Sequence, residues 1–299
     1  MAVAVAVAVA VTEHESDAAR VPELFAGSGV AGLAAPNRGE PELVVLADPE
    51  GVAREAAGRI AAALIAAVEH RGRADFCTTG GTTPIPIYRL LAQSPLRDRI
   101  AWPQVHVWFG DERFVPRDHP ESNVTPVDDV LLGGDSEEGG APLPAANIHP
   151  FPVDRAIAED HDNAWCAARY AEEMAANLPR LESNWPVFDL MMVGVGTDGH
   201  VLSCFPDSPA LDSLAWTVGV PAPSHVGPHL PRMTLNPRLL EAAPVLVVTW
   251  GAGKAEALGH VFGAVRDGRR WPVQRIRRAG AVWFVDEAAA AGIPKAGLG

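Results

Sequence analysis

Cysteine is scarce in this sequence, because the 299 residues include only Cys77, Cys166 and Cys204. These residues lie far apart, no Cys-x-x-Cys pair occurs, and no histidine cluster has the spacing of zinc ligands. Apolar runs are short as well, since none approaches the roughly 18 residues that cross a bilayer. The first residues lack the basic segment with which a secretory signal begins. The sequence therefore predicts reduced thiols in a cytoplasmic protein without a structural zinc site or a membrane span.

Positive charge is also in short supply. The 24 Lys and Arg residues against 37 Asp and Glu residues give a formal net charge of -13. A field of this sign repels nucleic acids, anionic membranes and anionic small molecules, so we expect no nucleic-acid partner and no membrane partner. An anionic ligand would need local cations. The composition, 48% hydrophobic and 20% charged, is otherwise that of a globular protein.

The chain begins with a segment of low complexity. Residues 1–12 alternate Ala and Val, and the stretch to about residue 41 is rich in Gly, Ala and Pro without sustained periodicity. We expect residues 1–40 to form a disordered tail, although the alternation in residues 1–12 also suits a strand. Residues 41–290 predict a single domain, followed by a short tail at residues 291–299. A monomer is the default expectation.

Short apolar runs alternate with helical patterns beyond residue 41, a rhythm typical of βαβ units around a mostly parallel sheet. Because the runs are apolar on both faces, helices should cover both sides of the sheet. The expected strands are residues 43–46, 75–78, 105–109, 188–193, 244–250 and 281–285, and the expected helices are residues 51–69, 85–91, 154–178 and 254–265. The predicted fold class is α/β, with an open sheet flanked by helices.

Ligands of such a sheet gather at the carboxyl ends of its strands, so the loops that follow the strands are the places to look for chemistry. The first unusual loop, TTGGTTP at residues 78–84, opens a helix. Paired glycines let the backbone approach an anion closely, and the helix N-terminus offers free N–H groups. The loop suits a phosphate group, although a plain turn with threonine caps has the same composition.

The second loop, GDER at residues 110–113, follows the predicted strand 105–109 and continues to Ser122 and Asn123. Arg113 is suited to grip a phosphate through paired hydrogen bonds. A solvated turn with internal ion pairs is the alternative, because surface charge is common after strands.

The third loop, GVGTDGH at residues 194–200, carries the strongest signal. In a locally extended segment the side chains of Asp198 and His200 project to the same side. A carboxylate beside an imidazole orients the ring or raises its basicity. Most single histidines are structural, but this one stands beside an Asp after a buried strand, which makes the pair a candidate for catalysis.

Two basic residues later in the chain are further candidates. Arg232 precedes a helix expected around Pro237, and Lys254 begins a helix after the predicted strand 244–250. A cation is poorly placed at a helix N-terminus, which is a small reason to expect that Lys254 serves a ligand.

An NAD-dependent oxidoreductase is a competing interpretation, because the glycines at residues 27–32 and 194–199 both fit the dinucleotide pattern. The first set follows no credible strand. The second has Asp198 where a pyrophosphate would lie, and Pro206 ends the helix that should follow.

Covalent catalysis is a further alternative, since Ser203 and Cys204 follow His200 at helical spacing. No Gly-x-Ser-x-Gly elbow is present, however, and Cys204 lies in an apolar run, so this alternative is disfavoured.

Taken together, these loops resemble the 6-phosphogluconolactonase family, which is related to the glucosamine-6-phosphate deaminases. The segments that match, in family order, are TGGTTP at residues 79–84, DER at 111–113 with SN at 122–123, GVGTDGH at 194–200 with SCFP at 203–206, RMT at 232–234 and GK at 253–254. The resemblance implies a Rossmann-like parallel sheet and no metal or organic cofactor. It also implies hydrolysis of 6-phospho-D-glucono-1,5-lactone, a sugar phosphate of the pentose phosphate pathway.

The resemblance implies roles for individual residues too. His200 would be the general base that activates water, and Asp198 would orient it. The residues implied to hold the phosphate are Gly80, Gly81, Thr82, Thr83, Arg113 and Lys254, with Arg232 as a helper. The remaining candidates for the substrate site are Thr79, Asp111, Glu112, Gly196 and Gly199.

Two related functions stay open. A deaminase of this family would need an Asn-Glu pair shortly after the Gly-His, where this chain has SCFPD at residues 203–207. A non-enzymatic sugar-phosphate sensor would keep the phosphate loop without needing His200 and Asp198. The chain also departs from the family at Thr79, where serine is common, and at Leu202, which would narrow the pocket.

Overall fold

The computed structural model describes residues 39–133, 139–181 and 183–294. Its main sheet consists of β1 (Glu42–Leu46), β2 (Ala74–Thr78), β3 (Val105–Phe109), β5 (Ile148–His149), β6 (Leu190–Val193), β9 (Val245–Thr249) and β10 (Ala281–Asp286). The strand order is β1-β10-β9-β6-β2-β3-β5, and every pairing is parallel. The six predicted strands all lie in this sheet, which confirms the predicted α/β class.

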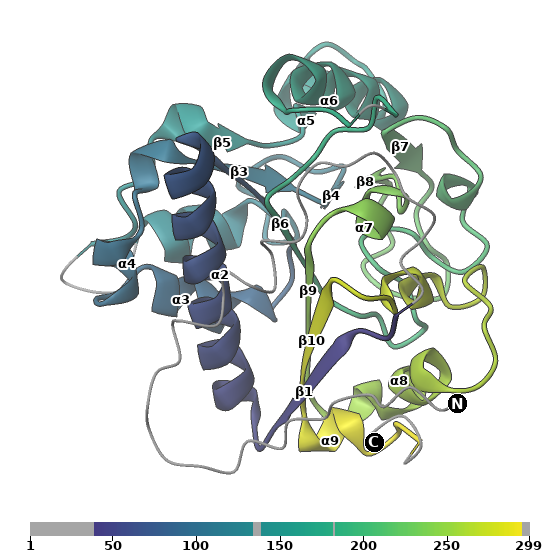
Figure 1. Ribbon diagram of the computed structural model, residues 1–299. Coiled ribbons are helices and arrows are strands. Elements are labelled where there is room, and N and C mark those ends of the chain that lie inside the picture. Colours follow the sequence, from purple (N-terminus) through teal and green to yellow (C-terminus); the bar gives the residue numbers. More distant parts are fainter. Residues whose placement is uncertain (1–38, 134–138, 182, 295–299) are drawn as a thin grey trace.

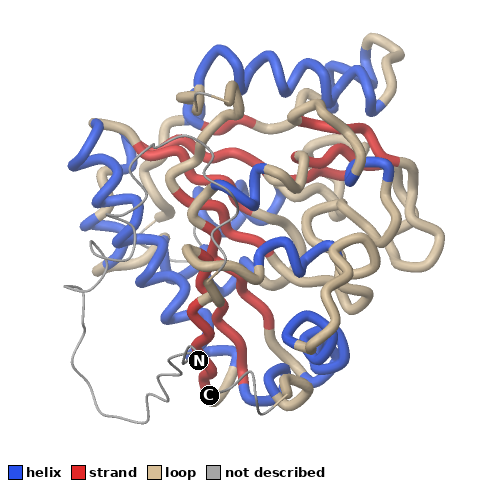
Figure 2. Tube along the Cα trace, turned by 45° about the vertical axis from the view of Figure 1, so that its right-hand side comes forward, coloured by secondary structure: helices blue, strands red, loops and turns tan. Residues whose placement is uncertain are grey.

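Helices cover both faces of this sheet, with α2 and α3 on one side and α8 on the other (Figure 1). The strands therefore lie in the interior and the helices outside them (Figure 2). The α-helices are α2 (Pro49–Arg71), α3 (Pro84–Leu91), α4 (Leu96–Arg99), α5 (Val153–Ala158), α6 (Asn163–Asn177), α7 (Leu239–Ala242), α8 (Ala255–Phe262) and α9 (Glu287–Ala290). Within the described ranges, no helix is long and apolar enough to cross a membrane.

The long helix α2 shows how sequence signals set an element. Asp48 caps its start by accepting a hydrogen bond from the Gly51 N–H at 2.7 Å, and Gly72 ends it with a φ of 76°. Its buried face is rich in alanine, including Ala53, Ala56 and Ala57. These small side chains let the helix lie close across the sheet.

One predicted helix is wrong in its continuity, because residues 154–178 form the two helices α5 and α6. The chain turns at Asp160, which has a φ of 56°. Asp162 then caps α6 by accepting a hydrogen bond from the Trp165 N–H at 2.8 Å. The left-handed residue therefore ends α5, and the capping aspartate starts α6.

A second, antiparallel sheet was missed by the sequence analysis. It consists of β4 (Asp111–Arg113), β8 (Arg232–Leu235) and β7 (Thr217–Val220), in the order β4-β8-β7. The interpretation of residues 110–113 as a loop is therefore wrong. Arg232 lies in β8, and the helix expected after it is α7, which begins shortly after Pro237. The charged β4 is a strand because it pairs with β8.

Gly110 is the point at which the chain leaves the main sheet and enters the second one. A Cβ atom there would lie 2.5 Å from the Leu202 side chain, so only glycine fits. Leu202 is 6% exposed and belongs to the core. The expectation that Leu202 narrows the pocket stays a prediction.

Candidate active site

Four adjacent strands of the main sheet, β9, β6, β2 and β3, deliver the candidate residues to the same side of the molecule. Residues 79–83 follow β2, β4 follows β3, residues 194–200 follow β6, and Lys254 comes after β9. From the middle of the sheet, β2, β3 and β5 follow one another towards one edge. The later strands β6, β9 and β10 follow one another towards the opposite edge. Such a reversal between β2 and β6 creates a crevice in which α/β proteins bind ligands.

The predicted pair Asp198 and His200 is in direct contact. Asp198 Oδ1 lies 2.5 Å from His200 Nδ1 and also accepts the backbone N–H of His200 at 3.2 Å. Because an ionised carboxylate can only accept, Nδ1 of His200 carries the proton, and Nε2 of the neutral ring holds a lone pair. The ring is oriented as a general base requires.

The electrostatics keep Asp198 ionised. Burial works to raise the pKa of Asp198, but the hydrogen bonds from His200 and from His225, together with the charge of His200, hold that pKa well below its usual range. A permanently charged carboxylate can stabilise the imidazolium that forms when His200 takes a proton.

The glycines of the loop allow this contact. A Cβ atom at Gly196 would lie 2.0 Å from His200 Nδ1, and Gly199 has a φ of 82° with Trp271 packed against it. The Gly196 N–H donates to the His200 carbonyl at 2.9 Å, which closes the turn. The predicted candidates Gly196 and Gly199 are therefore needed for the backbone shape that brings Asp198 to His200.

Sequence reasoning missed a further residue, His225. Its Nε2 lies 2.7 Å from Asp198 Oδ2. His225 belongs to the connection between β7 and β8 at residues 221–231, which is rich in proline and glycine. No spacing relates it to the loop at residues 194–200, so the sequence offered no signal for it.

Two arginines face each other across the second sheet. Arg113 in β4 is the register partner of Arg232 in β8, and the Nε atoms of both are buried without a hydrogen-bond partner among the described residues. Arg232 is 3% exposed, and burial lowers its pKa. Like charges opposite each other on a sheet are destabilising. The pair is suited to share an anion.

Arg232 connects this cationic pair to the catalytic candidates. Its guanidinium carbon lies 5.2 Å from the centroid of the Phe205 ring, and the same ring lies 4.7 Å from the ring of His200. The arginine pair and the imidazole are therefore parts of one continuous site.

The glycine-threonine loop reaches the same site through Asn123. A Cβ atom at Gly80 would lie 1.7 Å from Asn123 Oδ1, and Asn123 Nδ2 donates to the Asp111 carbonyl at 2.8 Å. Asp111 Oδ2 in turn accepts the Ser203 hydroxyl at 2.6 Å. Three separate loops are thereby held together.

The remaining residues of that loop differ in exposure. The Thr79 carbonyl accepts the Tyr88 hydroxyl at 3.0 Å, whereas Gly81 and Thr82 are exposed. Thr83 directly precedes α3 but makes no capping hydrogen bond through its side chain. A plain turn closed by a threonine cap is therefore disfavoured. The first turn of α3 adds little for a ligand, because Pro84 and Pro86 have no N–H and the Ile85 N–H donates to the Thr82 carbonyl at 3.3 Å.

Glu112 lies on the other face of β4 from Asp111 and Arg113, because side chains alternate along a strand. Its carboxylate accepts the Asn123 N–H at 2.8 Å and the Ser122 hydroxyl at 3.0 Å. Burial raises the pKa of Glu112 to about 7, against these donors. A direct contact between Glu112 and substrate stays a prediction, which this geometry does not favour.

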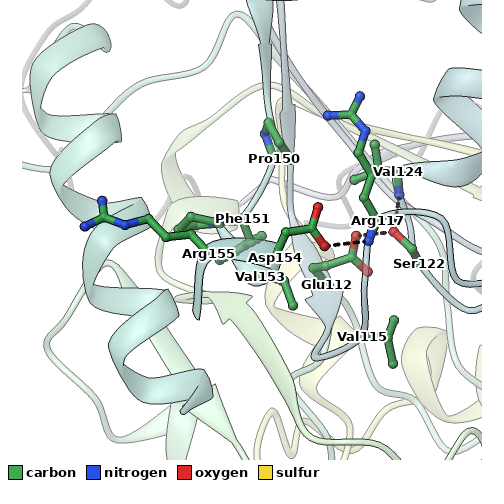
Figure 3. Close-up of a pocket in the computed structure, with 11 residues that line it drawn as sticks. Glu112, Val115, Arg117, Ser122, Val124, Pro150, Phe151, Val153, Asp154 and Arg155 are labelled. Carbon is green, nitrogen blue, oxygen red and sulfur yellow. Dashed lines mark hydrogen bonds between the residues drawn. The ribbon is translucent and has the colours of Figure 1, made fainter. Parts of the chain in front are cut away.

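A cavity of about 230 Å³ lies on that second face, lined by Glu112 and mainly apolar residues such as Val115 and Phe151. Figure 3 shows Arg117 and Arg155 among its lining residues. Both arginines already pair with carboxylates, Asp128 and Glu159 respectively. None of the loop residues 194–200 lines this cavity, so we place the chemistry elsewhere.

Lys254 reaches back to the catalytic loop. Its Nζ donates to the Val195 carbonyl at 2.6 Å. Burial lowers the pKa of Lys254, and the negative charge of Asp198 opposes that effect. Lys254 therefore stabilises the loop that carries Asp198 and His200, in addition to supplying positive charge.

The competing chemistries find little support. Ser203 is fully buried and donates to Asp111, and burial raises the pKa of Cys204 to about 12. The chain after Gly199 forms turns rather than the helix of a dinucleotide site, and residues 27–32 lie outside the described residues. Among the described residues, no group of three or more His, Cys, Asp or Glu side chains is arranged to hold a metal ion.

Residues 47–284 match the family described as glucosamine-6-phosphate isomerases/6-phosphogluconolactonase. The chain belongs to this family. A 6-phosphogluconolactonase of Streptomyces coelicolor is 35% identical over 85% of this chain and 95% of its own length, and one of Synechocystis is 33% identical over 83% and 97%. A crystal structure of devB protein superposes with a TM-score of 0.70 at 28% identity, covering 85% of this chain and all of that one. The family predicted from the ordered motifs is confirmed.

Proposed function

We propose that this protein hydrolyses 6-phospho-D-glucono-1,5-lactone to 6-phospho-D-gluconate, with His200 as the general base. The lactonase activity predicted from the sequence is confirmed by relatives of that name at 35% and 33% identity. The observation that supports the assignment of residues is the contact between Asp198 and His200 beside the buried pair Arg113 and Arg232.

His200 acts on water. Its Nε2 takes a proton from a water molecule as the water oxygen attacks the lactone carbonyl carbon, and the carbonyl oxygen becomes an oxyanion. When the tetrahedral intermediate collapses, the bond to the ring oxygen breaks, and the imidazolium returns its proton to that oxygen. The new carboxyl group then loses its proton to solvent. A positioned base of this kind contributes about 10² to 10⁴ in rate.

Asp198 and Lys254 support that step. Asp198 keeps the proton of neutral His200 on Nδ1 and stabilises the imidazolium, because its carboxylate contacts Nδ1 directly. Lys254 holds the Val195 carbonyl and brings positive charge near the carboxylate. Asp198 therefore holds the His200 ring, and Lys254 holds the loop that carries both residues.

The phosphate group of the substrate binds to Arg113 and Arg232, with the backbone of residues 80–83 as a second contact. An anion between the two guanidinium groups reduces the repulsion between them, in addition to the partial neutralisation that Arg113 receives from Glu121 at 3.4 Å. The fully or partly buried position of the arginines strengthens that attraction. These local cations explain how a chain with a formal net charge of -13 binds an anionic substrate.

We further propose that the protein acts in the cytoplasm as a monomer, on a small-molecule sugar phosphate and without a metal or organic cofactor. The phosphate contacts and the candidate base all come from one chain.

The proposed function is tested by comparing two lactones. Native protein should accelerate hydrolysis of freshly generated 6-phosphogluconolactone well above the spontaneous rate, and should have kcat/KM at least about 100-fold lower on unphosphorylated gluconolactone, because two charge-assisted contacts are lost. Equal kcat/KM values on both lactones would contradict the phosphate site. Release of ammonia from glucosamine 6-phosphate, without lactone hydrolysis, would contradict the lactonase itself.

A further inference from the structure

The Asp198 carboxylate binds two imidazoles, one on each oxygen. Oδ1 lies 2.5 Å from His200 Nδ1, and Oδ2 lies 2.7 Å from His225 Nε2. The side chain of Asp198 is only 14% exposed, so solvent contributes little to orienting it. Since the carboxylate can only accept, both rings must donate. His225 therefore holds its proton on Nε2, the atom that faces Asp198.

We propose that His225 is a positioning residue for the base: its N–H fixes the rotation of the Asp198 carboxylate and draws negative charge away from Oδ1. This inference rests on the proposed function of His200. A carboxylate that is free to rotate would meet His200 in a range of geometries. One that is bound at Oδ2 presents Oδ1 to His200 in a single orientation.

The segment that carries His225 is braced without it. Within residues 221–231, His229 Nδ1 donates to the Pro223 carbonyl at 2.7 Å, and Arg232 donates to the Pro228 carbonyl at 2.9 Å. The His225 side chain is 47% exposed. Its contact with Asp198 is therefore not required to close or bury the segment, which separates a role in positioning from a role in folding.

Aromatic packing places His225 beside the rest of the site. The edge of the Phe205 ring meets His225 with centroids 5.9 Å apart, and the same Phe205 ring packs against His200. Arg232 lies over Phe205 as well. Phe205 therefore packs against both of the histidines that contact Asp198.

The effect on the base has a definite sign. The groups that face Asp198 are His200 in its own loop, His225 from residues 221–231, Lys254 through its charge, and Arg270, whose guanidinium lies 3.5 Å from the Asp198 carbonyl. Loss of the His225 donor leaves more negative charge on Oδ1, so the imidazolium form of His200 is stabilised. The proton is then released at a higher pH.

The test uses two substitutions of the same residue. His225→Gln keeps an N–H donor of similar reach, and His225→Leu removes it. We expect His225→Leu to lower kcat about tenfold with little change in KM, and to move the acid limb of the kcat/KM–pH profile upward by about 0.5 pH unit. His225→Gln should restore most of kcat and return the acid limb toward its native position.

His229→Leu is the matched control, because it removes a histidine hydrogen bond from the same segment but not from Asp198. It should leave the acid limb in place, because it removes only the bond to the Pro223 carbonyl. The inference is overturned if His225→Leu retains native kcat and pH profile, or if His225→Gln behaves like His225→Leu. It is also overturned if His229→Leu moves the acid limb equally.

Two further measurements keep these outcomes distinct. If His200→Gln retains hydrolysis, the proposed function of His200 fails, and the role of His225 fails with it. If His200→Gln is inactive while His225→Leu is native in rate, only the inference about His225 is wrong. If His225→Leu melts below the assay temperature, ¹⁵N spectra of native protein and of Asp198→Asn are compared instead. The His225 Nε2–H signal should differ between the two spectra, and an unchanged signal contradicts the contact.

Discussion

Two carboxylates in this molecule are each associated with two histidines, but in a different order. At the candidate site, Asp198 stands between His200 and His225 and contacts both. At the edge strand β5 of the main sheet, Glu173 contacts His149 at 2.7 Å, and His149 contacts His106 at 2.9 Å. In the first set the carboxylate is central, and in the second it is at one end of a chain.

The difference lies in which nitrogen atoms remain available. His149 uses both ring nitrogens within the protein and stacks on Trp108 with centroids 3.9 Å apart. His200 uses Nδ1, whereas no described residue forms a hydrogen bond with its Nε2. A histidine whose nitrogens are all bound stabilises the fold, and a histidine with one free nitrogen at the carboxyl ends of parallel strands is available for chemistry.

The largest expected effect is a loss of kcat that separates the histidine bound to Asp198 from the histidine bound to Glu173. His200→Ala should lower kcat about 10² to 10⁴-fold, because the base is removed, and His149→Ala should leave kcat within about twofold of the native value at a temperature where it is folded. A coupled assay of lactone hydrolysis, corrected for the spontaneous rate, measures both. Equal losses of kcat in the two variants would contradict the different roles given to His200 and His149.

The next effect concerns the phosphate. Arg113→Met should raise KM about 10 to 100-fold with a smaller change in kcat, because a hydrogen bond to a charged group of roughly 1.5 to 3 kcal/mol is lost. Arg155→Met is the matched control, since Arg155 pairs with Glu159 on the surface. An unchanged KM in Arg113→Met counts against the role of Arg113.

A smaller effect is expected for Glu173→Gln, which weakens its contact with His149. The free energy of unfolding should fall by about 1 kcal/mol, measured by denaturant titration, while kcat/KM stays native. A loss of activity with unchanged stability would show that the chain of Glu173, His149 and His106 serves the reaction rather than the fold.

The smallest effect concerns pH. Burial, helped by the charge of Arg73, lowers the pKa of His106 to about 4 from 6.5. The unfolded chain therefore takes up this proton before the folded protein does, and stability that is fully present above pH 6.5 is lost as the pH falls towards 4. Because His106 is partly exposed and screened by solvent, the loss stays below about 1 kcal/mol. The difference in unfolding free energy between native protein and His106→Gln, measured across this range, isolates the effect, and a flat difference contradicts it.

The sequence predicted what local pattern encodes. Buried apolar runs identified six of the seven strands of the main sheet, all but the two-residue β5, and the glycines around Asp198 and His200 identified the catalytic candidates. The pattern could not identify β4, because Asp111, Glu112 and Arg113 form a strand only through pairing with β8. Tertiary pairing of this kind overrides local preference.

His225 illustrates the same limit within the site. It lies 27 residues from Asp198 in the chain, and only the packing of the second sheet brings them together. By contrast, the break between α5 and α6 had a local signal, because Asp162 is a typical capping residue. That error came from weighting helical periodicity over a capping signal.

The most direct measurement of the central claim is the affinity of His200→Ala for 6-phosphogluconate, determined by calorimetry on the preparation used for turnover. We expect a Kd within about threefold of the native value alongside the loss of hydrolysis, because the arginine pair binds phosphate and His200 acts only on water. A Kd that rises in proportion to the loss of turnover would contradict it, since His200 would then be holding the ligand or the site together.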